Sequence, residues 1–91
     1  MNKAELISAM AKKTDLSIKS SGDVLNALTE IISNELANGG SVQLVGFGTF
    51  ETRKRAARTG RNPQTGAVLN ISESTVPAFR AGKSLREEVN K

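Results

Sequence analysis

The side chains that offer chemistry in this sequence are cationic. Residues 52–72 contain no acid and five bases, at Arg53, Lys54, Arg55, Arg58 and Arg61. Guanidinium and ammonium groups pair with phosphate oxygens, so an acid-free basic run is typical of a segment that binds a polyanion. A solvated surface strand is the alternative, but such a strand normally mixes acids among its bases and has one apolar face. We therefore predict a polyanion-binding segment.

The positive charge is concentrated in the second half of the 91-residue chain. Residues 1–50 hold four bases and five acids, whereas residues 51–91 hold nine bases and four acids. The formal net charge of +4 suits a partner such as nucleic acid. The chain has no cysteine and no histidine, which excludes a disulfide scaffold, a Cys/His zinc site and catalysis by a thiol or an imidazole.

Motifs that resemble catalytic or cofactor signatures are incomplete. Gly82-Lys83-Ser84 resembles the end of a phosphate-binding loop, but that loop needs a glycine where Pro77 stands. Gly46-Phe47-Gly48 resembles the start of a dinucleotide fingerprint, but Glu51 stands where its third glycine should be. The two adjacent glutamates near the C-terminus splay apart on a helix, so they form no acid–base pair. We predict no enzymatic activity, no cofactor and no metal.

Two helices precede the basic run. Apolar residues at helical spacing predict a first helix that ends near Thr14. Ser17 is a suitable N-cap for a second helix, which Asn38-Gly39-Gly40 ends. Apolar and polar residues then alternate, and Gly46-Phe47-Gly48 predicts a tight turn into a strand. The sequence offers no physical reason for Gly22 in an early turn of the second helix.

The strand that carries the basic run must project into solvent. After Phe50 neither of its faces is apolar, and an unpaired guanidinium group is too costly to bury. Residues 61–66 have the asparagine, proline and glycine of a turn, and residues 67–76 then run back. These features predict a two-stranded arm at about residues 53–75. Leu85 and Val89, four residues apart, indicate a short final helix.

The predicted fold is a single α+β domain over residues 1–91. It has a helical part (1–40), a small antiparallel sheet extended into the arm (41–81) and a C-terminal helix (82–91). A chain this short with only three aromatic residues buries little surface, so we expect a homodimer that completes the core. The residues expected in that dimer core are Leu36, Leu44, Phe47, Phe50 and Phe79. No apolar run suits a membrane span or a signal peptide, which favours the cytoplasm.

Four segments of the sequence are similar to a known family. They are Met1-Asn2-Lys3, residues 45–50, residues 58–66 and residues 76–83. Together they resemble the histone-like HU proteins, within the bacterial HU and integration-host-factor family, across essentially the whole chain. The resemblance implies an intertwined dimer whose two β-arms embrace double-stranded DNA in the minor groove. It also implies a nucleoid protein that bends and condenses DNA with little sequence preference.

The resemblance assigns roles to individual residues. It implies that the arm arginines contact phosphates and minor-groove edges, and that Pro63 at the arm tip intercalates between DNA base pairs. It also implies that basic residues outside the arm contact DNA flanking the bend. The DNA-binding residues so implied are Lys3, Arg53, Arg55, Arg58, Arg61, Asn62, Pro63, Arg80, Lys83 and Arg86.

The sequence departs from the family pattern on the returning arm strand. The family usually has lysines near positions 67 and 70, where this chain has Ala67 and Asn70, so we expect a lower affinity. Family members also tend to have a small helix former in place of Gly22. A single-stranded RNA-binding or ribosome-associated module is the alternative function, although the arm has no aromatic residue for base stacking. A heterodimer with a paralogous chain is the alternative to a homodimer.

Overall fold

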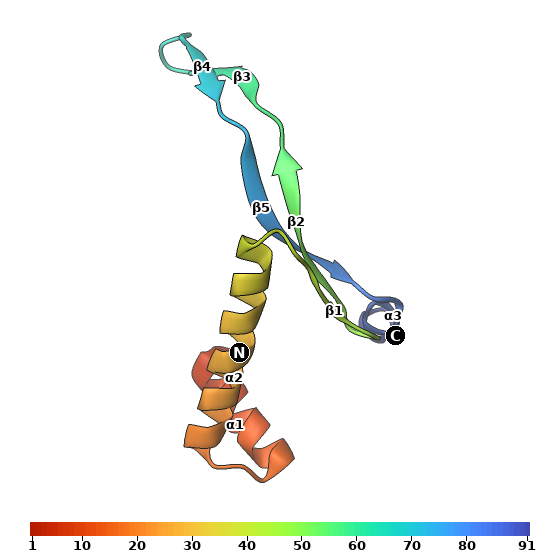
Figure 1. Cartoon of the computed structure of the whole chain (residues 1–91). Helices are drawn as coiled ribbons and strands as arrows, with labels where there is room; N and C mark the ends of the chain where they lie inside the picture. Colours follow the sequence, from red (N-terminus) through yellow and green to blue (C-terminus); the bar gives the residue numbers. More distant parts are fainter. The chain divides into compact units, whose positions relative to one another are not determined.

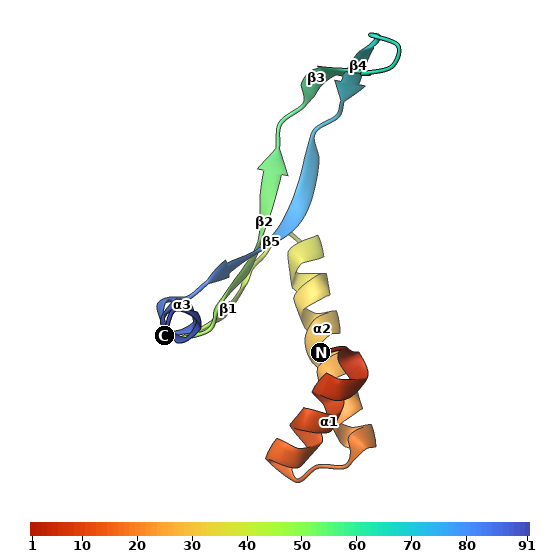
Figure 2. The same cartoon turned by 180° about the vertical axis from the view of Figure 1, so that it is seen from behind.

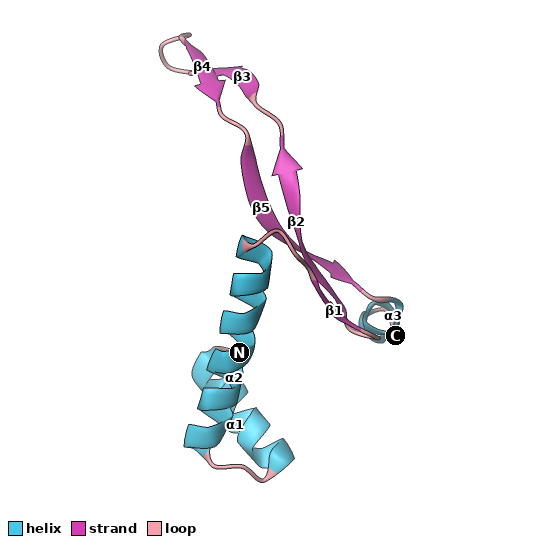
Figure 3. Ribbon diagram, viewed as in Figure 1, coloured by secondary structure: helices cyan, strands magenta, loops and turns pink.

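The computed structural model describes all 91 residues and contains three helices and five strands. In chain order the elements are α1 (Lys3–Thr14), α2 (Ile18–Ala37), β1 (Val42–Leu44), β2 (Gly48–Arg55), β3 (Arg58–Arg61), β4 (Val68–Ile71), β5 (Ser74–Ala81) and α3 (Lys83–Val89) (Figure 3). Their arrangement confirms the predicted α+β class. The chain divides into two compact units, the helical Met1–Glu35 and the strand-containing Leu36–Lys91. None of the three helices combines the length and the apolar character needed to cross a lipid bilayer.

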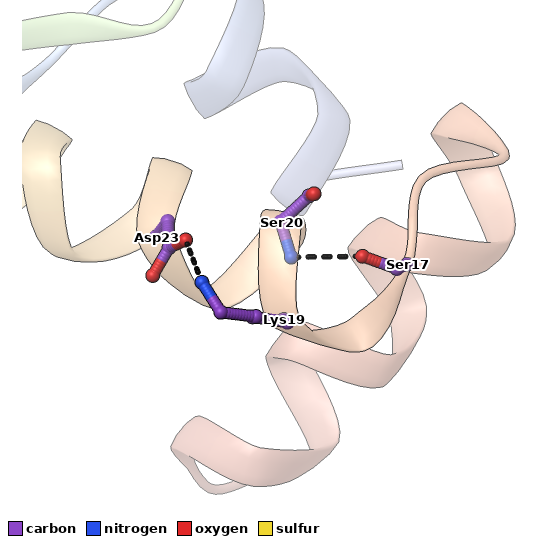
Figure 4. Close-up of polar contacts among 4 residues, drawn as sticks. All are labelled: Ser17, Lys19, Ser20 and Asp23. Atoms are coloured by element: carbon purple, nitrogen blue, oxygen red, sulfur yellow. Dashed lines mark hydrogen bonds and ion pairs between the residues drawn. The ribbon is translucent and has the colours of Figure 1, made fainter.

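Capping groups set the start of both helices in the first unit, and the cap of the second helix is the predicted Ser17. Asn2 Oδ1 accepts a hydrogen bond from the amide of Glu5 at 2.9 Å, at the beginning of α1. Ser17 Oγ accepts one from the amide of Ser20 at 3.0 Å, just before α2 (Figure 4). Each contact satisfies an amide that has no partner within its helix, and so fixes where the helix begins.

The connection between α1 and α2 and the first turns of α2 are polar. Asp15 ends α1 with φ at 60°, in the left-handed region. Lys19 Nζ and Asp23 Oδ2 lie 3.0 Å apart on the exposed side of α2 (Figure 4). A Cβ atom at Gly22 would lie 3.7 Å from Ile7 Cδ1, an ordinary van der Waals contact. Packing within the protomer therefore does not require a glycine at this position.

The first unit has a very small core of its own. Its only buried side chains are Ser21, at 1% exposed, and Leu25, at 8%. Other apolar side chains of α2 are open to solvent, including Val24 at 51%, Leu28 at 42% and Ile31 at 63%. α2 therefore carries hydrophobic side chains that the first unit does not bury, although water disfavours exposed apolar surface.

The second unit is built on a three-stranded antiparallel sheet in the order β1-β2-β5. β1 and β2 are joined by a tight turn in which Gly46 has φ at 85° and the amide of Phe47 donates to the carbonyl of Leu44 at 2.9 Å. The ladder between β2 and β5 runs along the full length of both strands, from Gly48 opposite Ala81. The turn and the start of β2 agree with the sequence prediction.

Gly48 allows the backbone of β2 to approach an aromatic side chain closely. A Cβ atom at this position would lie 2.5 Å from Phe79 Cζ and 2.7 Å from the carbonyl oxygen of Arg80. Both distances are shorter than real Cβ contacts, so the packing here depends on glycine.

Beyond this sheet the chain continues into a second, two-stranded antiparallel sheet of β3 and β4. Its pairs run from Arg58 opposite Ile71 to Arg61 opposite Val68. Residues 56–57 and 72–73 separate it from the β2–β5 ladder, and a turn over residues 62–67 closes it. In two opposite views, β3 and β4 lie at one end of the strands and α3 at the other (Figures 1 and 2). We call residues 53–75 the arm.

Candidate nucleic-acid interface

The arm carries arginines that no acid neutralises. Arg55, Arg58 and Arg61 are all exposed. The acids in and beside the arm are Glu73, which pairs with Lys54, and Glu51, which pairs with two other arginines. None of the three exposed guanidinium groups forms an ion pair. They are therefore available to an external anion.

The two strands of the arm differ in charge. All five of its bases lie on the outgoing half, residues 53–61, whereas the returning half, residues 62–75, has no base and one acid, Glu73. Lys54 Nζ lies 3.9 Å from Glu73 Oε1, and both side chains are exposed, so this weak pair neutralises part of the outgoing charge. Three exposed apolar side chains lie on β4, at Val68, Leu69 and Ile71. The arm thus presents a cationic outgoing strand beside a returning strand that has no basic residue and a single acid.

The tip of the arm is a turn organised by the side chain of Asn62. Its Oδ1 accepts hydrogen bonds from the amides of Gln64 at 2.9 Å and Thr65 at 3.4 Å, and its carbonyl accepts one from the amide of Gly66 at 2.7 Å. Gly66 has φ at 70°, which a glycine adopts without strain. Pro63 is exposed within this turn. The sequence predicted a turn role for Asn62, and the structure adds the hydrogen bonds by which its side chain shapes the turn that carries Pro63.

The other predicted DNA-binding bases lie outside the arm. Arg80 is on β5, Lys83 and Arg86 are on α3, and Lys3 begins α1 in the other unit. The start of α3 is tied to the β1–β2 turn, because the amide of Gly82 donates to the carbonyl of Phe47 at 2.8 Å. Arg80 and Arg86 line an open recess of about 310 Å³ beside this contact. The structure therefore brings two bases of different elements to one surface.

The three phenylalanines form a cluster in the second unit. The ring centroids of Phe50 and Phe79 lie 4.8 Å apart, and those of Phe47 and Phe79 lie 5.4 Å apart. Phe47 is 46% exposed and Phe79 is 41% exposed, while Leu44 is 37% exposed and Leu36 is half-buried. Of the five residues predicted to form a dimer core, three are thus exposed in the protomer, whereas Leu36 and Phe50 are partly buried.

An acid that sequence reasoning did not single out lies among the predicted bases. Glu51 Oε1 is 3.3 Å from Arg80 Nε, and Glu51 Oε2 is 3.7 Å from Arg53 Nε. Strand alternation alone places Glu51 and Arg53 on one face. Arg80 joins them only through the ladder register, which sets Thr49 opposite Arg80 and which the sequence did not reveal. No group of acidic side chains in the chain is arranged to hold a metal ion.

Comparison with known proteins gives this arrangement a family. The sequence model described as "Bacterial DNA-binding protein" matches residues 1–90. The chain belongs to this family, that of the HU proteins. It is 57% identical to the DNA-binding protein HU of Clostridium pasteurianum over 91 residues, which cover both chains completely. It is 55% identical to the DNA-binding protein HU of Staphylococcus aureus (strain COL) over 89 residues, 98% of this chain and 99% of that one.

Solved structures of HU proteins have the same fold as this HU-family chain. The HU chain of an Anabaena HU–DNA cocrystal structure superposes with a TM-score of 0.92 at 48% identity, covering 98% of this chain and 97% of that one. HU from Thermotoga maritima gives a TM-score of 0.70 at 36% identity, covering 98% of each chain. The predicted family is confirmed, and with it the prediction of a DNA-binding protein rather than an enzyme.

Proposed function

We propose that this HU-family protein is an architectural component of the bacterial nucleoid, in the cytoplasm. It binds double-stranded DNA as a homodimer with little sequence preference, and it bends and condenses that DNA. The observation that carries the proposal is the arm, an exposed hairpin with three unpaired arginines and Pro63 at its tip. Family membership and the likeness to an HU chain from a DNA cocrystal support it.

The arm's chemistry favours contacts with the DNA backbone over reading of bases. Arg55, Arg58 and Arg61 offer guanidinium groups to phosphates on either side of a groove, and such contacts carry no sequence information. Lys3, Arg80, Lys83 and Arg86 extend the same kind of contact to flanking DNA. Because these contacts are all to phosphates, they give affinity for DNA with little sequence preference.

Pro63 supplies the bending of DNA that the basic side chains cannot produce by phosphate contacts alone. A rigid apolar ring at the tip of a basic hairpin inserts between two base pairs in the minor groove, which unstacks them and kinks the duplex. Asn62 holds the ring in place through its hydrogen bonds to the turn. Bending thus depends on the tip, whereas affinity depends mainly on the charged strand.

A second copy of the chain covers the apolar surfaces that the protomer leaves open. The exposed side chains of α2 and the phenylalanine cluster are of the size and type found in permanent dimer interfaces. A paralogous chain with the same surfaces would pair in the same way. The intact mass of the complex isolated from its own host distinguishes the homodimer from the heterodimer.

Competition binding tests the proposed partner. A labelled linear duplex is titrated with protein in a gel-shift assay at 50 and 200 mM salt, with single-stranded RNA of equal length as competitor. If ~6 to 10 phosphates are neutralised, the affinity for duplex falls by ~10³ to 10⁵ between these salt concentrations. The RNA should compete weakly, because the arm has no aromatic residue on which bases could stack. An affinity for duplex that does not change with salt concentration, or RNA that competes as well as duplex does, contradicts the proposal.

A further inference from the structure

Glu51 lies on a face of the β2–β5 ladder that also carries arginines. In the β2–β5 ladder Phe50 lies opposite Phe79, whereas Glu51 lies opposite Ala78. Since side chains alternate along a strand, Glu51 points away from the phenylalanine cluster, to the face that also carries Arg53 and Arg80. Its two carboxylate oxygens divide between these two arginines, at 3.7 Å and 3.3 Å.

This ion pair differs from the others in the chain. The carboxylates of Asp23, Glu73, Glu87 and Glu88 are 60–67% exposed, and each pairs with a single lysine. The side chain of Glu51 is only 27% exposed and holds two arginines at once. Glu51 is therefore the acid that most restricts bases of the proposed interface.

A phosphate that approaches Arg53 or Arg80 meets guanidinium groups that already have an anionic partner. Phosphate and carboxylate oxygens compete for the same N–H donors. If the phosphate takes those donors, the Glu51 carboxylate loses its cations and remains close to a second negative charge. It must then attract a salt cation, which offsets part of the counterion release that drives DNA binding.

We propose that Glu51 is a built-in competitor for phosphate, which lowers the affinity of the sheet for DNA and weakens the salt dependence of binding. The inference rests on the proposed function, since it concerns how tightly the same surface holds DNA. In this role Glu51 restrains Arg53 and Arg80, whose guanidinium groups would otherwise both be open to phosphate.

The test replaces Glu51 by an uncharged residue of the same shape. Glu51→Gln should bind a linear duplex about three- to tenfold more tightly at 50 mM salt, as expected for removal of a partly exposed competing charge. The slope of log affinity against log salt should become steeper by ~1 to 2 per dimer. Each of the two copies then gains about one net counterion released, and each contributes ~0.9 to the slope.

Glu88→Gln is the matched control. It makes the same chemical change and the same change in net charge, and Glu88 pairs with Lys91, a base outside the proposed interface. This variant should leave affinity and salt slope nearly unchanged. An equal gain in both variants would show that net charge alone matters and would overturn the role of Glu51.

A double-variant cycle tests whether Glu51 acts through its arginine. In an Arg80→Gln background the gain from Glu51→Gln should shrink, because one of the two competing ion pairs is already absent. Thermal melting of each variant confirms that it is folded, and partial unfolding can only reduce binding, so it cannot imitate the expected gain.

Failure of the competitor role of Glu51 can be distinguished from failure of the proposed function. If the parent protein binds duplex and Glu51→Gln binds equally or more weakly, the competitor role is wrong while the proposed function stands. If the parent protein does not bind duplex at all, the proposed function itself is wrong, and the competitor role is overturned with it.

Discussion

At the tip of the arm, Pro63 is held in a turn whose geometry depends on hydrogen bonds to Asn62. Replacing Pro63 by alanine removes a rigid apolar ring and no charge. We expect Pro63→Ala to bind linear duplex within about threefold of the parent protein, because phosphate contacts supply most of the affinity. Bending, measured by energy transfer between labels at the two DNA ends, should fall clearly, because the variant has no wedge.

The chain's other proline provides the control for this prediction. Pro77 lies opposite Thr52 in the β2–β5 ladder, well away from the turn over residues 62–67. Pro77→Ala should leave the bend at the parent value. Equal bending by the Pro63 variant and the parent protein would remove Pro63 from the mechanism.

Asp15 and Gly39 allow a test of backbone strain with opposite signs. Both have φ in the left-handed region, at 60° and 83°, where glycine is favoured. Asp15→Gly should raise the free energy of unfolding by about 0.5–1 kcal/mol, and Gly39→Ala should lower it by about 1 kcal/mol. Thermal unfolding at one fixed protein concentration measures both. A destabilised Asp15→Gly variant would contradict the strain argument.

Among single residues, sequence reasoning identified those whose role is local. Ser17 as a helix cap and Gly46 in a tight turn were predictable, because capping and positive φ depend on neighbours in the chain. The close approach at Gly48 and the two arginine contacts of Glu51 were not, because both depend on which residue of β5 lies opposite β2. Gly22 remains without an explanation within the protomer.

Among the elements, the arm is the one whose placement follows most directly from charge. A strand that is basic on both faces cannot be buried, and the structure confirms the exposed hairpin predicted on that ground. The interruption of the ladder at residues 56–57 and 72–73 was not predicted, since the alternation of residue types continues through it. Pairing of Lys54 with Glu73 was also missed, because it requires the register between the two arm strands.

The unpaired arginines of the arm should determine how steeply binding depends on salt. Arg58→Ala combined with Arg61→Ala removes four guanidinium groups from a dimer. We expect the slope of log affinity against log salt to decrease in magnitude by ~3 to 4, at ~0.9 for each phosphate that is no longer neutralised.

Lys12→Ala combined with Lys13→Ala is the charge-matched control for the arm variant. These two exposed lysines lie in the last turn of α1 and are outside the proposed interface. The control should retain the parent slope. A similar decrease of slope in both double variants would show that binding follows net charge and does not depend on the arm.

For the whole molecule, the short sequence with few aromatic residues predicted a core too small for a lone protomer. The structure adds which surfaces are left open, namely the exposed face of α2 and the phenylalanine cluster. If a second copy covers them, folding and association are one process. The midpoint of thermal unfolding should then rise with protein concentration, and sedimentation should give the mass of two chains. A monomer whose melting ignores concentration would contradict this.

The central claim is that a dimer bends duplex DNA with two arms, and a titration of an end-labelled linear duplex tests it most directly. On addition of protein, energy transfer between the two DNA ends should increase and should saturate at two protomers for each bound site. Binding that is complete by gel shift while energy transfer stays at the value of free DNA would contradict the account.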